Sequence, residues 1–211
     1  MLATDWVTVS SIATAAATLV LALATFASVR SANRAARVAE RSLLAGLRPL
    51  LMPSRPDDPP QKVGFADERW FLVPGSGAIC QVTPESIYLA AAMRNVGSGI
   101  AVLHGWYLDT EDTRSNEHVP LDDFRRLTRD LYIAPAEIGF WQGALRDPSE
   151  PVFAQARSAI EAPRRIAVEI LYGDVELGRR VISRFGLSPR DDGTWLVTVA
   201  RHWNVDGAAP R

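Results

Sequence analysis

The longest apolar stretch of the chain runs from Trp6 to Val29 and contains no charged residue. As a helix this stretch would be about 36 Å long, and the hydrocarbon core of a bilayer is ~30 Å thick. The pattern therefore predicts a transmembrane helix over residues 6–29, with residues 1–5 as a short external head. A cleaved signal peptide is one alternative, but the flank before the stretch lacks Lys and Arg. A buried helix of a soluble bundle is another.

Arginines follow the apolar stretch at helical spacing. Arg30, Arg34, Arg37 and Arg41 recur at steps of four, three and four, which places them on one face of a continuing helix over residues 30–48. They form either a membrane-surface collar, where each arginine near anionic lipid contributes ~1 kcal/mol, or a solvated face that only sets topology. Gly46 and Pro49 are expected to end this helix.

The arginines also predict an orientation. Five of them, including Arg48, follow the apolar stretch, whereas none precedes it. The positive-inside rule then places the C-terminal side in the cytoplasm and the N-terminus outside. We expect a single-pass protein of the cell (inner) membrane whose larger part faces the cytosol.

Beyond residue 49 the pattern changes to short β-branched and aromatic runs, after a weak strand at Leu50–Met52 and a proline-rich linker or loop at Arg55–Gly64. Runs bounded by Gly, Pro, Asp or Ser predict seven strands. They are Trp70–Val73, Ala78–Val82, Ser86–Asn95, Ile100–Leu108, Ile166–Tyr172, Arg179–Phe185 and Thr194–Trp203. This number of strands in ~160 residues predicts an immunoglobulin-like antiparallel β-sandwich over residues 49–211.

Two short helices are expected to interrupt the strands of this mainly β fold. Leu121, Phe124, Leu127 and Leu131 form an apolar face at helical spacing, which favours a helix over Leu121–Leu131. A second helix is predicted over Pro151–Ala162, with proline in its first turn and another proline immediately after it.

Charge separates the chain into two parts. Residues 1–48 carry a net charge of +3 and residues 49–211 a net charge of −4, in agreement with the total of −1. The larger part therefore has no basic surface to support nucleic-acid binding. The single cysteine, Cys80, excludes an intramolecular disulfide and is expected to be a small buried core residue.

Motifs for catalysis or for a cofactor are absent from the sequence. None of the three histidines has a second ligand at a metal-site spacing, so we expect no metal. The chain lacks GxSxG, HExxH and paired cysteines, and Asp122 and Asp123 are adjacent, where they would not face each other. No catalytic residue and no cofactor is predicted, and the protein is not expected to be an enzyme.

One polar cluster near the C-terminus could bind a ligand. In a regular strand, Arg201 and Trp203 share a face with Trp195, while His202 points the other way. The arginine is then either stacked on a tryptophan as a structural cation–π contact or part of a carboxylate or phosphate pocket with Arg184.

Thr14, Thr18 and Ala22 form a row of small residues at spacing four in the apolar stretch. Such rows allow close approach of two helices, so they predict helix association and a possible homo-oligomer. The alternative is that these residues are simply tolerated in lipid.

The segment Arg94-Asn95-Val96-Gly97-Ser98-Gly99 lacks the spacing and the lysine of a phosphate loop, so we interpret it as a strand-connecting turn. Together with Ser86-Ile87-Tyr88-Leu89, Ile182-Ser183-Arg184-Phe185 and Arg201-His202-Trp203-Asn204, it resembles uncharacterised single-pass membrane proteins of actinobacteria. The resemblance implies a membrane location and no activity.

These patterns favour a membrane-anchored cytoplasmic interaction protein, either an adaptor or an accessory subunit. Its expected partners are the lipid bilayer and an unidentified protein. The alternative is a ligand-binding sensor or an enzyme with an anion pocket lined by Arg184, Arg201 and Trp203.

Overall fold

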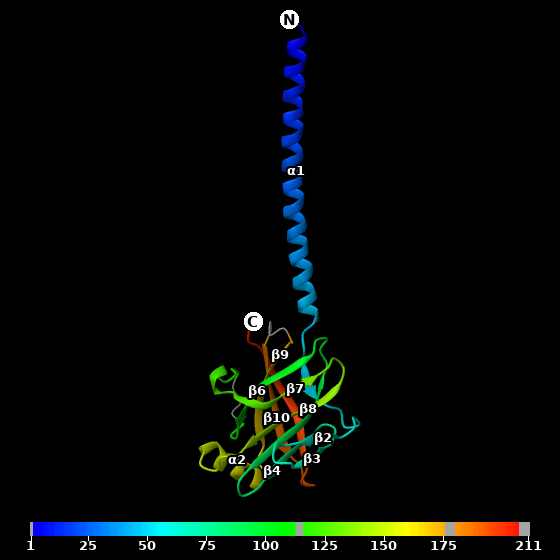
Figure 1. Ribbon diagram of the computed structural model, residues 1–211. Helices are drawn as coiled ribbons and strands as arrows, with labels where there is room; N and C mark the ends of the chain where they lie inside the picture. Colours follow the sequence, from blue (N-terminus) through cyan, green and yellow to red (C-terminus); the bar gives the residue numbers. More distant parts are fainter. Residues whose placement is uncertain (1, 113–115, 176–179, 207–211) are drawn as a thin grey trace. The chain divides into compact units, whose positions relative to one another are not determined.

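The computed structural model describes residues 2–112, 116–175 and 180–206. The chain divides into two compact units, Met1–Gly46 and Leu47–Arg211, each of which is described by itself. Figure 1 follows the chain from the N-terminal helix α1 into the strands of the second unit.

The first unit is one uninterrupted helix, α1, over Leu2–Gly46. Its stretch Trp6–Glu40 is long and apolar enough to cross a membrane, by length and composition. All large apolar side chains from Trp6 to Val29 are exposed, as expected of a helix that has lipid around it. Thr14 and Thr18 donate their hydroxyl hydrogen bonds to backbone carbonyls one turn earlier, which satisfies these polar groups within the helix. Residues 2–5 also belong to α1, and residue 1 lies outside the described residues.

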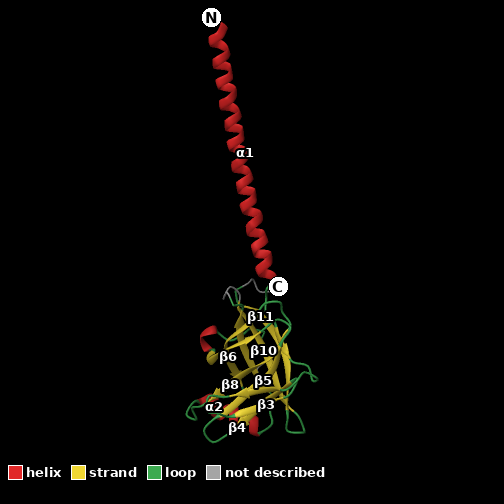
Figure 2. Ribbon diagram, turned by 45° about the vertical axis from the view of Figure 1, so that its right-hand side comes forward, coloured by secondary structure: helices red, strands yellow, loops and turns green. Residues whose placement is uncertain are grey.

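The second unit is an antiparallel β fold, and Figure 2 shows its strands in yellow. In the described residues, nine strands form one curled sheet in the order β1-β5-β4-β11-β10-β9-β6-β7, with β8 on the other edge of β5. The strands are β1 (Leu51–Pro53), β4 (Gly77–Val82), β5 (Ile87–Asn95), β6 (Ala101–Asp109), β7 (Arg125–Ile133), β8 (Ile138–Leu145), β9 (Ile166–Gly173), β10 (Arg180–Pro189) and β11 (Trp195–Asn204).

The main core lies inside this curl. Alternate residues of β9, namely Ile166, Val168, Ile170 and Tyr172, all belong to it, as their period-two pattern predicts. Helix α2 (Pro151–Glu161) contributes Phe153, Ala156 and Ala159 to the same core and lies near β4 and β5. The core thus joins strands from both halves of the sequence with one helix.

A smaller core covers the opposite face of β5. The hairpin of β2 (Gln61–Gly64) and β3 (Trp70–Val73) packs Val63 and Val73 against Tyr88, Ala90 and Ala92. Since β5 is buried on both faces, its sequence is a continuous apolar run without alternation.

The segment that follows α1 is held firmly by the loop 95–99. Ser98 N–H donates to the carbonyl of Arg48 (3.1 Å), and Val96 N–H donates to the carbonyl of Leu50 (2.8 Å). The buried Asn95 side chain accepts from the N–H groups of Leu50 and Gly97 and donates to the carbonyls of Gly99 and Ile133. The turn expected between two strands therefore also clamps residues 47–50.

Gly97 and Gly99 are required for this clamp, because a Cβ atom on either would overlap a backbone carbonyl of residues 47–48. We expect Gly99→Ala to displace the segment and to lower the free energy of unfolding by about 2 kcal/mol, the value of two hydrogen bonds. Urea unfolding of the full chain in detergent micelles measures this. Gly46→Ala is the matched control, since a Cβ at Gly46 meets no atom within 4 Å. Equal stability of the two variants would contradict the clamp.

The helix predicted over Leu121–Leu131 is wrong. A short 3₁₀ turn at Leu121–Asp123 is followed by strand β7, whose Leu127 and Leu131 pack against the main core. Leucines four residues apart lie on one face of a helix and also on one face of a strand. Pairing with β6 decides for the strand. The second helix is confirmed as α2.

The seven predicted strands are present, Trp70–Val73 with its predicted ends and the others with shifted ends, and Arg179 lies outside the described residues. Strand β1 confirms the weak first strand, displaced by one residue. Three strands were not expected: β2, which lies within the supposed linker, β7 and β8. The mainly antiparallel β fold is confirmed. The immunoglobulin-like arrangement is not confirmed.

Candidate functional site

The polar cluster near the C-terminus is shaped by a bulge in β11. Arg184 of β10 pairs with Arg201, but the next residue, Phe185, pairs with Val199, so Ala200 is the extra residue. The bulge reverses the alternation of side chains beyond it. Trp195 belongs to the main core, whereas Arg201 and Trp203 lie on the opposite face with Arg184, so the face-sharing predicted for a regular strand is wrong.

Arg184 is buried and already holds two carboxylates. Its Nε atom lies 3.0 Å from Glu169 Oε1 and its Nη2 atom 3.2 Å from Asp109 Oδ2. Glu169 stands opposite Arg184 in the ladder of β9 and β10, and Asp109 ends β6. Three strands thus bring these charges together.

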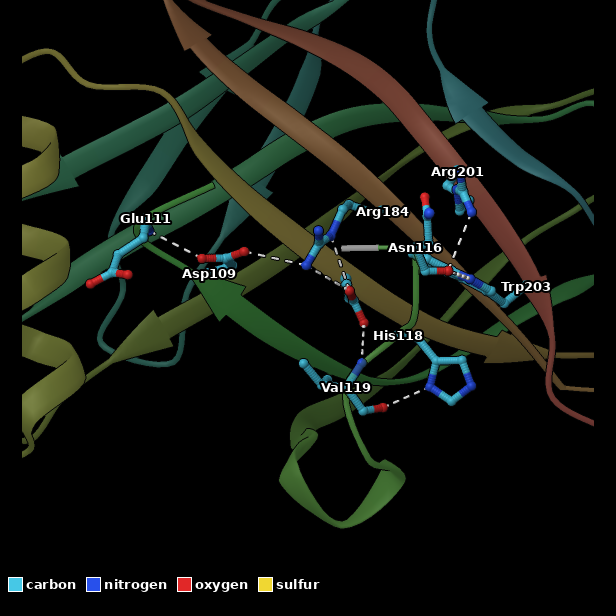
Figure 3. Close-up of polar contacts among 9 residues, drawn as sticks. Asp109, Glu111, Asn116, His118, Val119, Arg184, Arg201 and Trp203 are labelled. Carbon is cyan, nitrogen blue, oxygen red and sulfur yellow. Dashed lines mark hydrogen bonds and ion pairs between the residues drawn. The ribbon is translucent and has the colours of Figure 1, made fainter. Parts of the chain in front are cut away.

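A loop covers this cluster (Figure 3). Val119 N–H donates to Glu169 Oε2 (3.1 Å), and the carbonyl of Asn116 accepts hydrogen bonds from Arg201 Nη1 (3.2 Å) and Trp203 Nε1 (3.1 Å). We call these residues, with Arg184 and Asp109, the Arg184 cluster. Residues 113–115 of the connection lie outside the described residues.

The charge of Arg184 is balanced by carboxylates within the Arg184 cluster. Burial raises the pKa of Glu169, although the Val119 N–H and the Arg184 guanidinium act in the opposite direction. The Arg184 side chain is only 7% exposed. The Arg184 guanidinium therefore interacts with carboxylates of the protein itself. The role that this geometry supports best is to attach the 116–119 loop to the sheet.

The three ligand residues predicted from the sequence lie on the neighbouring strands β10 and β11. Arg184 and Arg201 are brought together by register, and Trp203 lies beside Arg201, with the guanidinium 6.0 Å from the centre of the indole. This contact corresponds to the cation–π interpretation. The rings of His118 and Trp203 also pack edge to face, with 5.9 Å between their centroids.

His202 belongs to a different polar network, on the core side of the sheet. Ser183 Oγ lies 2.6 Å from His202 Nδ1 and 2.8 Å from the hydroxyl of Tyr172, which accepts the N–H of Leu51 (3.2 Å). A serine next to a histidine is the geometry of an activated nucleophile. Ser183 is fully buried, however, so this arrangement is structural. Burial and nearby Arg48 lower the pKa of His202.

An apolar surface on β3 was missed by the sequence reasoning. Trp70 and Leu72 are 61% and 63% exposed, on the face of the hairpin turned away from the smaller core. Lys62 lies over the Trp70 ring at 4.8 Å. The alternation Trp70-Phe71-Leu72-Val73 contains the signal, since either face of this strand is apolar.

Beside Leu72 lies a groove of about 400 Å³ whose largest lining side chain is Trp195. We call Trp70, Leu72 and this groove the Trp70 surface. The remaining groove residues are Pro60, Pro74, Ala78, Ile79, Cys80, Gln81, Gly193 and Thr194. Burial raises the pKa of the Cys80 thiol, and its side chain packs against the main core, so the thiol is not poised as a nucleophile.

The helix positions predicted from sequence all lie on α1. Thr14, Thr18 and Ala22 line one shallow face of the helix. Arg30, Arg34 and Arg37 are exposed, and the side chain of Arg41 lies outside the described residues. Helix association and lipid contact remain predictions.

The described residues include no group of three or more His, Cys, Asp or Glu side chains that could hold a metal ion. No family model matches the chain, and neither a curated protein nor a solved structure matches it. Function must therefore be argued from the surfaces described above.

Proposed function

We propose that this chain is a membrane-anchored cytoplasmic interaction protein, an adaptor or accessory subunit that binds another protein at the inner face of the membrane. The anchor is the apolar stretch of α1. The orientation follows from the five arginines on its C-terminal side. Self-association through Thr14, Thr18 and Ala22 is part of this proposal.

The Trp70 surface is the observation that carries the proposal. Two large apolar side chains on one strand are more than half exposed, and one of them, Leu72, lines an apolar groove. Exposed apolar patches next to a groove are typical of protein–protein contact sites, where aromatic anchors supply much of the binding energy. Folding alone gives no reason to expose Trp70 and Leu72 together.

The alternative, a sensor or enzyme with an anion pocket at Arg184, Arg201 and Trp203, has less support. Arg184 is neutralised by Glu169 and Asp109, and Arg201 Nη1 donates to the carbonyl of Asn116. An anion would have to displace the two carboxylates to reach Arg184.

Site-specific photocrosslinking in the host membrane tests the proposal. A photoreactive phenylalanine derivative at Leu72 of the full chain should give a discrete crosslinked protein, because Leu72 is exposed at the centre of the Trp70 surface. The same residue at Ala154, exposed on α2, is the control and should not give that product. Adding Trp70→Ser should weaken the Leu72 product.

Orientation is checked in the same cells with a fluorescent protein fused to the C-terminus, which should be fluorescent because it would fold in the cytosol. A dark, exported fusion would contradict the orientation. Equal crosslinking at Leu72 and Ala154 would contradict the binding surface.

A further inference from the structure

In the described part of the main sheet, no backbone ladder joins β7 and β8, and we call the gap between these two strands the seam. β7 and β8 follow each other in the chain, but β7 pairs with β6 and β8 pairs with β5. The strands are close near their connecting turn, where Gly139 packs against Ile133. In the described strand pairings, the outer edges of β7 and β8 have no neighbouring strand.

A cavity of about 290 Å³ lies in this seam, at the end away from the turn. Leu127 and Thr128 of β7 line one side, and the consecutive residues Gln142, Gly143 and Ala144 of β8 line the other. Because side chains alternate along a strand, consecutive lining residues mean that the backbone edge itself borders the cavity. The seam therefore presents the backbone edge of β8 to a ligand, which would take the place of the side-chain hydrogen bond from Arg129 Nη2 to Gln142 Oε1 (3.0 Å) that crosses the seam here.

The aromatic wall of the cavity is Trp106 of β6. A Cβ atom on Gly143 would lie 2.8 Å from the Trp106 ring, so the glycine lets the indole lie directly against the backbone of β8. Trp106 also packs edge to face on Trp141 at 5.5 Å. An apolar side chain entering the cavity would meet this indole.

A large bulge in β7 adjoins the same cavity. Leu103 of β6 pairs with Leu131 of β7, but Gly105 pairs with Arg126, so residues 127–130 fall outside the regular ladder. Bulges occur preferentially at sheet edges and beside functional sites. Here the bulge leaves part of β7 without its β6 partner, next to the cavity.

Most of the charges at the rim of the cavity are paired with one another or with a neighbouring side chain. Arg125 is paired with Glu150, and Arg146 with Asp67. The Asp147 carboxylate accepts hydrogen bonds from Ser149. Among the described residues that line the cavity, Arg126 and Asp147 form no ion pair, and exposed Arg126 is the basic group that a carboxylate of a ligand could reach.

We propose that the seam binds an extended peptide of another protein by strand addition to the β8 edge at Gln142–Ala144. The peptide would place an apolar side chain against Trp106 and a carboxylate near Arg126. Strand addition uses the backbone for affinity and alternate side chains for selectivity. The inference goes beyond the proposed function, because it concerns a surface separate from the Trp70 surface and a defined class of partner.

The test uses the full chain in phospholipid nanodiscs and a phage-displayed library of random twelve-residue peptides as the probe. Acid-containing peptides should be enriched, and the strongest should bind at least about tenfold more weakly to Thr128→Trp, which fills the cavity; tenfold corresponds to about 1.4 kcal/mol. Asp130→Trp is the matched control, because Asp130 is exposed on the same strand but does not line the cavity. Its affinity should stay within about twofold of the parent.

Two further readouts distinguish strand addition from adhesion to the surface. N-methylation of the peptide should weaken binding at alternate positions only, since one edge of an added strand bonds to β8. Arg126→Glu should weaken acidic peptides and preserve thermal stability. Failure to enrich any peptide, unchanged binding to Thr128→Trp, or equal effects of N-methylation at all positions would overturn the proposal. Trp70→Ser tests the other surface and should leave peptide binding unchanged.

Discussion

Replacing Glu169 with alanine should lower the free energy of unfolding by about 3–5 kcal/mol, the usual cost of breaking a buried ion pair by removing one of its members. Glu169 is fully buried and its carboxylate is bonded to Arg184 and to the N–H of Val119. The alanine variant removes one of the two carboxylates that Arg184 contacts. Urea unfolding of the full chain in detergent micelles, followed by tryptophan fluorescence, gives the value.

The triple variant Glu169→Leu, Arg184→Met and Asp109→Asn is the control, because Asp109 also pairs with Arg184. The raised pKa of Glu169 indicates that burial disfavours its charge more than Arg184 favours it. Replacing all three charges with neutral groups of similar size should therefore recover at least half of the lost stability. A Glu169→Ala variant as stable as the parent would mean that water reaches Arg184 and that the loop over the Arg184 cluster opens freely.

Trp195→Ala should also cost about 3–5 kcal/mol, because truncating a large core side chain removes buried surface and leaves a cavity. Trp195 is 9% exposed and belongs to the main core, at the point where β11 pairs with β4. Thermal melting of the full chain measures the loss.

Trp70→Ala is the matched control, since Trp70 is 61% exposed and a surface substitution of this kind usually changes stability by less than about 0.5 kcal/mol. If Trp195→Ala melts with the parent, Trp195 is not a core residue. It would then have to be treated as an exposed wall of the Trp70 surface.

The apolar helix and the strands with clear alternation could be predicted from the local sequence pattern alone. Ile166–Tyr172 could be predicted because one face of β9 is buried and its residues alternate. β7 could not, because its leucines fit two periods and only pairing with β6 separates them. β8 contains two glycines, which weaken a strand signal, and its partner β5 lies about fifty residues earlier.

The candidate site could likewise be predicted only in part. Arg184, Arg201 and Trp203 were identified from residue type, and the ladder of β10 and β11 does bring the two arginines together. Glu169 and Asp109, which neutralise Arg184, come from other strands, and Asp109 lies 75 residues away in sequence. A single sequence contains no local sign of such a pairing, so the neutralisation of Arg184 could not be foreseen.

The clamp on residues 47–50 sets the length of the tether in the proposed membrane anchor. A flexible linker of twenty residues would let its two ends separate by about 25 Å and explore a correspondingly wide volume. Here α1 ends at Gly46, and backbone bonding to the β domain begins at Arg48. In the proposed function, a tether this short would give a high effective concentration only to partners in the same membrane, and a soluble partner would gain little from it.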